Sequence, residues 1–224
     1  MSKKFLVIGN PIEHSLSPKL HNYWIKKNNL NALYDKKLLE HGKIKQLISN
    51  VREEKIHGLN VTVPFKKMVI PFLDILSDEA KNSQSVNTIY KDKGKIIGDN
   101  TDIEGFKTAL ETTNQVIKNK KALILGAGGV VPSIIVALKK MQISKIYLSN
   151  RTELKALEIK KLFPEIEIIE WGKVTSFDII INATSIGLNK KDEINIDYKN
   201  ISPNKFFYDV IYNPKETNFL RRAK

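Results

Sequence analysis

The chain has 224 residues, of which 42% are hydrophobic, so it holds enough apolar material for one large globular domain or two small ones. Its formal net charge is +13, because 37 basic residues face 24 acidic ones. The absence of cysteine excludes disulfides and thiolate metal sites. No apolar run has the length of a signal peptide core or a membrane span, so we expect a cytoplasmic protein.

The positive charge alone does not predict nucleic-acid binding. The arginines are Arg52, Arg151, Arg221 and Arg222, which leaves 33 lysines among the 37 basic residues. These lysines are scattered, and no basic segment is interleaved with aromatic residues that could stack on bases. We therefore expect a small-molecule substrate, with no nucleic acid and no membrane as partner, and keep nucleic-acid binding as an alternative suggested by charge alone.

Strand-like and helix-like segments alternate through the first hundred residues. Predicted strands cover residues 4–9, 32–38, 58–63, 85–90 and 95–98. Predicted helices cover residues 18–28 and 44–54. This pattern predicts an N-terminal α/β domain over residues 1–101.

The second part of the chain, residues 102–224, has a different pattern. Apolar residues at helical spacing predict a linking helix near residues 103–112. A buried strand at 122–125, a glycine turn, a helix and a strand at 145–148 then form a βαβ unit. The expected fold class is therefore α/β, with two domains: an N-terminal α/β domain and a Rossmann-like domain built on a doubly wound parallel sheet.

A glycine-rich turn lies directly between a buried strand and a helix. It consists of Gly126, Ala127, Gly128, Gly129 and Val130. This context favours a dinucleotide-binding turn, since a missing side chain at Gly128 would let a pyrophosphate approach the helix N-terminus. The third glycine position of the usual pattern holds Val131, and a plain strand-to-helix turn remains the alternative.

The end of the next strand indicates which dinucleotide would bind. No carboxylate stands there to hold the adenosine ribose of NAD; the segment carries Asn150, Arg151, Thr152 and, one turn later, Lys155. Guanidinium and ammonium groups suit the extra phosphate of NADP, so NADP is the expected cofactor. The alternative is that Thr152 only caps a helix and Arg151 is a solvated side chain.

Two further segments carry candidate chemistry. Ser15 and Ser17 precede Pro18, so Ser17 is expected as the N-cap of a helix whose positive end would attract a small carboxylate. Simple capping is the alternative. In the second segment, Pro64 ends a strand and is expected to open a helix that carries Lys66. Asp102 is either a helix cap or the carboxylate partner of Lys66 in an acid/base pair.

Eight ordered motifs covering nearly the whole chain resemble those of the shikimate dehydrogenases. They are Ser15-Leu16-Ser17-Pro18 and the segments 60–66, 85–88, 100–105, 126–129, 150–152, 182–185 and 208–212. The resemblance implies an NADP-dependent oxidoreductase that reduces 3-dehydroshikimate to shikimate in aromatic amino-acid (chorismate) biosynthesis. It also implies a monomer or homodimer in which residues 1–101 form the substrate-binding and catalytic domain and residues 102–224 form the NADP-binding domain.

The resemblance implies roles for individual residues. Lys66 and Asp102 would be the catalytic pair. The substrate carboxylate would be held by Ser15 and Ser17, and its ring hydroxyls by Thr62, Asn87 and Tyr212. The cofactor would be bound by Gly126, Ala127, Gly128, Gly129, Val130, Asn150, Arg151, Thr152, Lys155, Thr184 and Val210, with Asp78 near it in some members of the family.

Other interpretations of these residues stay open. In these alternatives, Thr62 faces solvent in an alternating strand, Asn87 stabilises a turn, and Tyr212 is an aromatic residue packed at a chain reversal. His14 and His21 flank the serine motif without carboxylate partners at ligand spacing, so no metal site is predicted.

Members of that family continue for some tens of residues past the segment of Tyr212, into a helix that we do not expect within the 224 residues. Either the sequence omits this tail, or one wall of the substrate pocket is absent. The alternatives to the main expectation are therefore a quinate/shikimate dehydrogenase of the same fold and a catalytically silent shikimate-binding relative.

Overall fold

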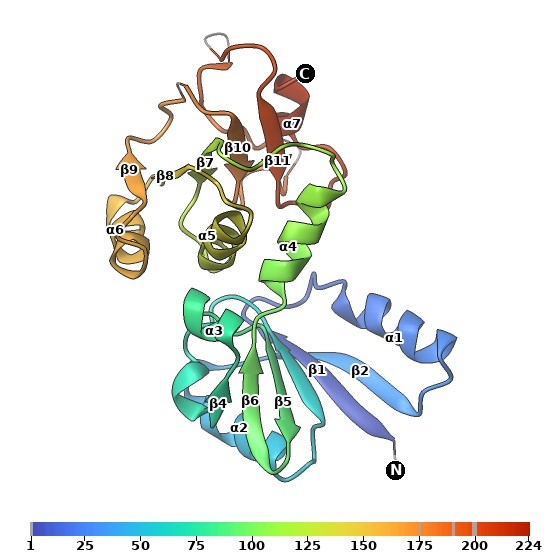
Figure 1. Cartoon of the computed structure of the whole chain (residues 1–224). Coiled ribbons are helices and arrows are strands. Elements are labelled where there is room, and N and C mark those ends of the chain that lie inside the picture. The colour runs from blue at the N-terminus through green and yellow to red at the C-terminus, as the bar shows by residue number, and fades with distance from the viewer. Residues whose placement is uncertain (1, 175, 190, 199–200) are drawn as a thin grey trace. The chain divides into compact units, whose positions relative to one another are not determined.

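The computed structural model describes residues 2–174, 176–189, 191–198 and 201–224. The chain divides into two compact units, Met1–Ile103 and Glu104–Lys224, each with its own sheet (Figure 1). The division falls within helix α4 (Asp102–Glu111). The α/β fold class is confirmed.

The first unit is a six-stranded mixed sheet with three α-helices. Its strands are β1 (Lys3–Gly9), β2 (Ala32–Leu38), β3 (Gly58–Val61), β4 (Ile75–Leu76), β5 (Thr88–Asp92) and β6 (Lys95–Asp99). Its helices are α1 (Ser17–Lys27), α2 (Ile44–Arg52), α3 (Asp78–Ser83) and the 3₁₀ helices η1 (His41–Lys43) and η2 (Ile70–Phe72). The strand order is β2-β1-β3-β5-β6-β4, in which β5 is antiparallel to both its neighbours and the other pairs are parallel.

The two faces of this sheet are covered differently. Helix α2 buries four residues at helical spacing, Ile44, Leu47, Ile48 and Val51, and these pack in one cluster with Leu6 and Ile8 of β1. The alternate residue Val7 faces a smaller cluster with Tyr34 on the other face. Helix α1 contributes no buried residue to either cluster.

Strand directions in the first unit bring four chain segments to one edge of the sheet. Strands β1, β3 and β6 run in the same direction, so the residues that follow each of them leave the sheet at a common edge. Strand β5 runs the opposite way and therefore starts at that edge, with Asn87 directly before it. The segments of Ser15, Lys66, Asn87 and Asp102 meet here for this reason.

In its described residues, the second unit contains a five-stranded sheet in which every pair is parallel. Its strands are β7 (Lys121–Leu125), β8 (Lys145–Ser149), β9 (Glu167–Ile169), β10 (Ile179–Asn182) and β11 (Phe206–Asp209), in the order β11-β10-β7-β8-β9. Its described α-helices besides α4 are α5 (Val131–Lys140), α6 (Glu153–Leu162) and α7 (Asn218–Arg222). The chain order reverses between β7 and β10, which makes that gap the topological switch point where such sheets bind ligands.

Packing around β7 and α5 is dense. All four residues 122–125 are fully buried, as expected of a central parallel strand. Helix α5 buries eight consecutive residues, from Val131 to Leu138. Val131 itself is 0% exposed, so the departure from glycine or alanine at this position is accommodated within the core.

The predicted helix after Pro64 is wrong. Residues 63–69 form successive turns that lead into η2, and isolated bonds such as Phe65 N to Thr62 O replace a helical ladder. Pro71 explains the difference, because it lacks a donor and disfavours the α conformation of the residue before it. Only six residues separate the two prolines, too few for a stable helix.

The expected N-cap role of Ser17 is also wrong. Ser17 is the first residue of α1, and Leu16 is the cap, without a side-chain hydrogen bond. The hydroxyl of Ser15 instead accepts a hydrogen bond from the backbone N–H of Ser17 at 3.3 Å. Pro18 within the first turn therefore agrees with the prediction, while the capping hydroxyl comes from two residues earlier.

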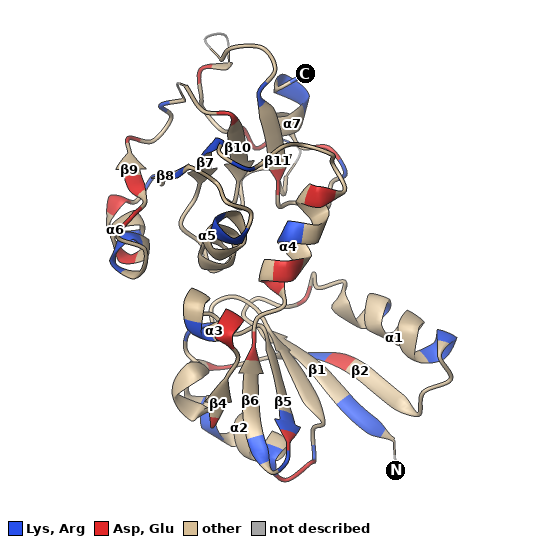
Figure 2. Ribbon diagram, in the orientation of Figure 1, with Lys and Arg blue, Asp and Glu red and all other residues tan. Residues whose placement is uncertain are grey.

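Surface charge does not form a stripe in either unit. Basic and acidic residues occur together on elements such as α4 and α6, whereas α1 and α5 carry only basic charges (Figure 2). Several basic residues pair with acidic ones, as Lys107 does with Glu104 on α4. Among the described residues, no helix has both the length and the apolar character needed to cross a membrane.

Candidate active site

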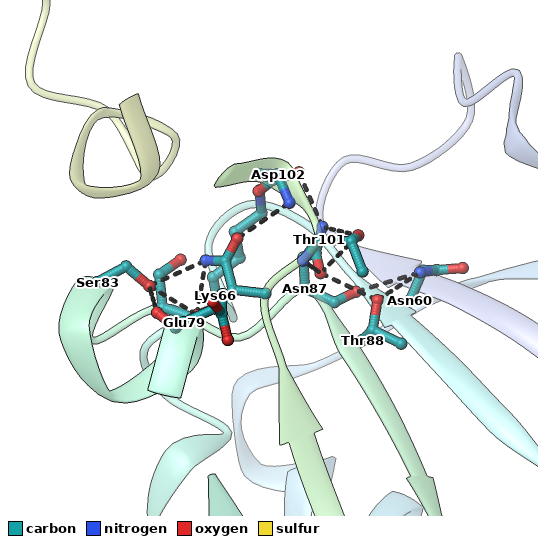
Figure 3. A network of polar contacts seen from close by, with 10 residues as sticks. Asn60, Lys66, Glu79, Ser83, Asn87, Thr88, Thr101 and Asp102 are labelled. Atoms are coloured by element: carbon teal, nitrogen blue, oxygen red, sulfur yellow. Dashed lines mark hydrogen bonds and ion pairs between the residues drawn. The ribbon is translucent and has the colours of Figure 1, made fainter. Parts of the chain in front are cut away.

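Lys66 and Asp102 form a direct ion pair at the shared edge of the first unit. Lys66 Nζ donates to Asp102 Oδ2 at 2.6 Å (Figure 3). The Lys66 side chain is 12% exposed and that of Asp102 26%, whereas Lys67 is exposed. The structure therefore singles out the first of two adjacent lysines and places it beside a carboxylate that is 36 residues away in the sequence.

Asn87 fixes the other oxygen of the Asp102 carboxylate. Its Nδ2 donates to Asp102 Oδ1 at 2.8 Å and to Thr101 Oγ1 at 2.9 Å. Its Oδ1 accepts from the backbone N–H of Thr101 at 2.9 Å, which defines the orientation of the amide. Asn87 is 9% exposed and lies within this network, so the simple turn interpretation is wrong.

Backbone hydrogen bonds hold the pair in place from both sides. Val86 N–H donates to the carbonyl of Lys66 at 2.9 Å, which ties the turn after β3 to the start of β5. The N–H of Asp102 donates to the side-chain oxygen of Asn100 at 3.0 Å. Asn100 is 1% exposed and its amide donates to the carbonyl of Ser85 at 2.8 Å. The short loops that carry Lys66 and Asp102 are thus cross-linked.

The serine motif and Thr62 lie at the same edge of the sheet. Ser15 and Ser17 are half-buried in the segment after β1, and Thr62 is half-buried directly after β3. Thr62 N–H donates to the carbonyl of Ile8 at 2.9 Å. A Cβ at Gly9 would lie 2.6 Å from Thr62 Cγ2, so glycine at this position allows the two segments to approach.

The glycine turn of the second unit lies at the switch point. Gly126 has a φ of +107°, and a Cβ there would lie 2.8 Å from the carbonyl oxygen of Ala183, the residue after β10. Packing therefore requires glycine at position 126. Gly128 and Gly129 are exposed; a Cβ at Gly129 would meet nothing within 4 Å, and one at Gly128 would meet the Ala183 oxygen only at 3.7 Å.

Packing thus gives no reason for glycine at positions 128 and 129, but a phosphate approaching the backbone does. Both residues precede α5, whose N-terminus is the positive end of the helix dipole. Ala127 and Val130 complete the turn as half-buried residues. The turn fits the pyrophosphate of a dinucleotide on this observation.

Basic residues follow β8, the next strand of the sheet. Arg151, Thr152 and Lys155 are all exposed, and Thr152 is the N-cap of α6 without a side-chain capping bond. The amide of Asn150 donates to the carbonyl of Thr152 at 2.7 Å and so shapes the loop. Two cationic side chains and an unengaged capping hydroxyl thus surround the start of α6, an arrangement that suits a phosphate.

The loops after β10 and β11 carry Thr184 and Val210. Asn182, which is fully buried, accepts from Thr184 N–H at 3.0 Å and donates from Nδ2 to both carboxylate oxygens of Asp209 at 3.1 Å. Thr217 Oγ1 donates to Asp209 Oδ2 at 2.6 Å. Sequence reasoning missed Asn182 and Asp209 as supports of these loops, although both lie in the motifs quoted above.

Two predicted site residues stand apart from these networks. Tyr212 belongs to the second unit and is 74% exposed, so the packed-aromatic interpretation is wrong. Asp78 is the first residue of α3 in the first unit, is exposed, and pairs with Lys81 at 3.4 Å. In the parts of the chain that the structure describes, no three His, Asp or Glu side chains gather in a way that could hold a metal ion.

The fold and these features define a class. A parallel sheet with a glycine turn at its switch point, basic residues at the next strand, and a separate α/β unit bearing a lysine–carboxylate pair are the features of a nicotinamide-dinucleotide-dependent dehydrogenase. Family models give the particular group: the shikimate dehydrogenase substrate-binding domain matches residues 7–89, and shikimate / quinate 5-dehydrogenase matches residues 107–214. The chain belongs to the shikimate dehydrogenase family.

Individual relatives agree over the whole length of the chain. A shikimate dehydrogenase (NADP(+)) of Pelagibacter ubique is 75% identical over 224 residues, which is 100% of this chain and 84% of the relative. The crystal structure of shikimate dehydrogenase from Aquifex aeolicus has a TM-score of 0.90 at 37% identity, covering 99% of this chain and 83% of that one. The Thermus thermophilus enzyme, solved with NADP(H) and shikimate, has a TM-score of 0.87 at 30% identity, with coverage of 99% and 83%.

Proposed function

We propose that this protein is an NADP-dependent shikimate dehydrogenase that reduces 3-dehydroshikimate to shikimate in aromatic amino-acid biosynthesis. The observation that carries the proposal is the 2.6 Å pair between Lys66 and Asp102, held by Asn87 at the edge where the serine motif also lies. The 75% identity to a shikimate dehydrogenase (NADP(+)) supports the choice of substrate and cofactor.

The proposed roles of the pair follow from the chemistry of ketone reduction. When a hydride reaches the carbonyl carbon, the oxygen must gain a proton, and Lys66 Nζ is the donor in this proposal. Asp102 accepts one hydrogen bond from Nζ and thereby orients it, while Asn87 keeps the carboxylate from rotating. In the oxidation of shikimate, the same pair accepts the proton from the hydroxyl.

The remaining side chains of the proposed substrate site bind polar groups of the substrate. Ser15 and Ser17, beside the positive end of α1, would hold the carboxylate. Thr62, Asn87 and Tyr212 would hold the ring hydroxyls. A substrate hydroxyl bound by Asn87 would replace Thr101 Oγ1 as the partner of Nδ2, because Thr101 and Asp102 take both amide donors.

The cofactor proposal uses the glycine turn and the basic loop. NADPH, when bound, supplies the hydride. The residues proposed to hold its pyrophosphate are Gly126, Ala127, Gly128, Gly129 and Val130. Those proposed for the adenosine phosphate are Asn150, Arg151, Thr152 and Lys155, and those for the nicotinamide side are Thr184 and Val210. A role of Asp78 near the cofactor rests on the resemblance alone.

Steady-state kinetics of the purified protein test this function. We expect shikimate to drive reduction of NADP⁺, followed at the absorbance of NADPH, with little turnover when quinate replaces shikimate or NAD⁺ replaces NADP⁺. Comparable turnover with quinate would favour a quinate/shikimate dehydrogenase instead. Shikimate binding measured by calorimetry without any turnover would favour a catalytically silent relative.

We include a cytoplasmic location and a monomeric or homodimeric state in the proposal. The absence of cysteine fits a reducing compartment, and the proposed substrate is a soluble metabolite. Fractionation of cells with an antibody against the protein would test the location. Light scattering coupled to size exclusion would test the oligomeric state, and a mass well above that of a dimer would contradict it.

A further inference from the structure

Helix α1 is attached to the first sheet by polar contacts and by the partly buried Ile25, which packs against the cluster of Val7, Ile12 and Tyr34. None of its eleven residues is buried, although the serine motif lies at its start. Asn22 Nδ2 donates to the carbonyl of Tyr34 at 2.7 Å, and Tyr34 N–H donates to Asn22 Oδ1 at 3.0 Å. Tyr34 lies on β2, the edge strand, so the Asn22 amide pairs with backbone groups that have no neighbouring strand on that side.

The ring of Tyr34 is enclosed between the helix and the sheet. It is 5% exposed and stacks on the imidazole of His21, with ring centroids 4.1 Å apart and planes at 7°. Burial raises the pKa of the Tyr34 hydroxyl and lowers the pKa of His21. At neutral pH the tyrosine therefore remains a hydrogen-bond donor, and the stacked imidazole is neutral.

The Tyr34 hydroxyl reaches the strand that leads to Lys66. It donates to Asn60 Oδ1 on β3 at 2.6 Å. The same amide donates from Nδ2 to Thr88 Oγ1 at 3.2 Å and to the carbonyl of Asn87 at 3.3 Å. The carbonyl of Asn87 can only accept, so it fixes which end of the Asn60 amide is the nitrogen, and the tyrosine hydroxyl then anchors the oxygen end by donating to it.

From Asn60 the hydrogen bonds continue to the proposed catalytic pair. Thr88 Oγ1 donates to Asn87 Oδ1 at 2.9 Å, and Asn87 Nδ2 donates to Asp102 Oδ1 at 2.8 Å. Asp102 then accepts from Lys66. Figure 3 shows this series from Asn60 to Asp102, with the side chains of β3 and β5 pointing toward one another.

We propose that Tyr34 is a positioning residue of the substrate site. Through its backbone it holds α1, which begins at the serine motif, and through its hydroxyl it sets the Asn60 amide and so the side chains that orient Asp102. A single buried residue thus fixes the distance between the groups proposed for the substrate carboxylate and those proposed for its reacting carbon. This inference rests on the proposed function.

The substitution Tyr34→Phe tests the hydroxyl. It keeps the ring and its stack on His21 and removes one hydrogen bond. The loss of one hydrogen bond typically changes an equilibrium constant, such as that for substrate binding, by roughly three- to tenfold. We expect kcat/KM for shikimate to fall by about that factor, mainly through KM. The KM for NADP⁺ should stay within about twofold of the wild-type value, since Tyr34 lies in the first unit and the proposed cofactor loops lie in the second.

A matched control and a double-mutant cycle separate positioning from general stability. Tyr90→Phe removes a hydroxyl from β5 of the same sheet at a 40% exposed position, and should leave both KM values unchanged. Asn60→Ala removes the acceptor. If the hydroxyl acts through Asn60, then Tyr34→Phe in the Asn60→Ala background should have no further effect on KM for shikimate.

Each outcome of this cycle decides the inference. A wild-type KM for shikimate in Tyr34→Phe would overturn it, and so would effects of the two substitutions that simply add. A parallel loss of NADP⁺ affinity would also overturn it, because that indicates general loosening. Should Tyr34→Phe fail to fold, Asn60→Ala alone must raise KM for shikimate selectively. Absence of turnover in the wild type would refute the proposed function instead. That result differs from a failure of the inference about Tyr34, which requires an active wild type.

Discussion

Among single residues, Lys66 and Lys67 show how position separates two identical side chains. The Lys66 side chain is 12% exposed and bonded to Asp102, whereas Lys67 is exposed. The sequence predicted the candidate lysine from the strand, the proline and the family motif. It did not predict the turns that carry it, because Pro64 favours the start of a helix while Pro71, seven residues later, prevents one from forming.

Replacing Lys66 should affect chemistry more than binding. We expect Lys66→Ala to lower kcat by about 10²- to 10⁴-fold, the usual contribution of a general acid, with KM for shikimate changed only a few-fold. Lys67→Ala is the matched control and should retain near-normal kcat, since Lys67 is exposed. Stopped-flow or steady-state measurement of NADPH formation gives both parameters. Near-normal kcat in Lys66→Ala would remove this residue from the role of acid.

At the scale of elements, the loop between β7 and α5 contains glycines of two kinds. Gly126 is required by the fold, because of its positive φ and the nearby carbonyl oxygen of Ala183. Gly129 has no such constraint and is exposed. The sequence showed the glycine-rich turn, but it could not assign these different reasons, since the neighbour that crowds Gly126 belongs to a loop more than fifty residues later.

Two alanine substitutions should separate folding from cofactor binding. Gly126→Ala combines strained backbone with an overpacked contact, so we expect a loss of roughly 2–4 kcal/mol in unfolding free energy. Gly129→Ala should leave the unfolding free energy within about 0.5 kcal/mol of wild type, yet raise KM for NADP⁺ if a pyrophosphate lies against it. Urea titration and kinetics measure the two effects. Equal destabilisation by both substitutions would contradict this assignment.

At the scale of the whole molecule, the net charge of +13 is spread over both units while individual acids make specific bonds. Asp74 accepts from both terminal nitrogens of Arg52, at 2.9 and 3.0 Å, and from Ile96 N–H at 2.7 Å. The bonds from Arg52 and then from Ile96 lower the pKa of Asp74 to about 2. This carboxylate links α2 to β6 and the segment before β4.

The pH dependence of stability should report this bond. Because the folded pKa of Asp74 lies below its ordinary value of about 4, the stabilisation is present above that pH and is lost as the pH falls toward 2. Asp74→Asn should therefore be less stable than wild type at pH 7, with a difference that shrinks between about pH 4 and pH 2. Denaturant unfolding of both proteins at a series of pH values measures this difference in the free energy of unfolding.

Asp92→Asn, an exposed position at the end of β5, is the control for this experiment and should show no such trend. If the free energy of unfolding of Asp74→Asn stayed below that of wild type by a constant amount down to pH 2, the shape of the side chain would matter and its charge would not.

The sequence by itself determined the class of fold, most of the strands and helices, the residue types of the candidate site and the family. It could do so because apolar periodicity, proline and glycine act locally, over a few residues. Only the tertiary structure decided which side chains meet. The bonds from Tyr34 to Asn60, from Asn87 to Asp102 and from Asp102 to Lys66 join residues 15 to 36 positions apart. Such contacts depend on strand order and direction, which bring the ends of β1, β3 and β6 and the start of β5 to one edge.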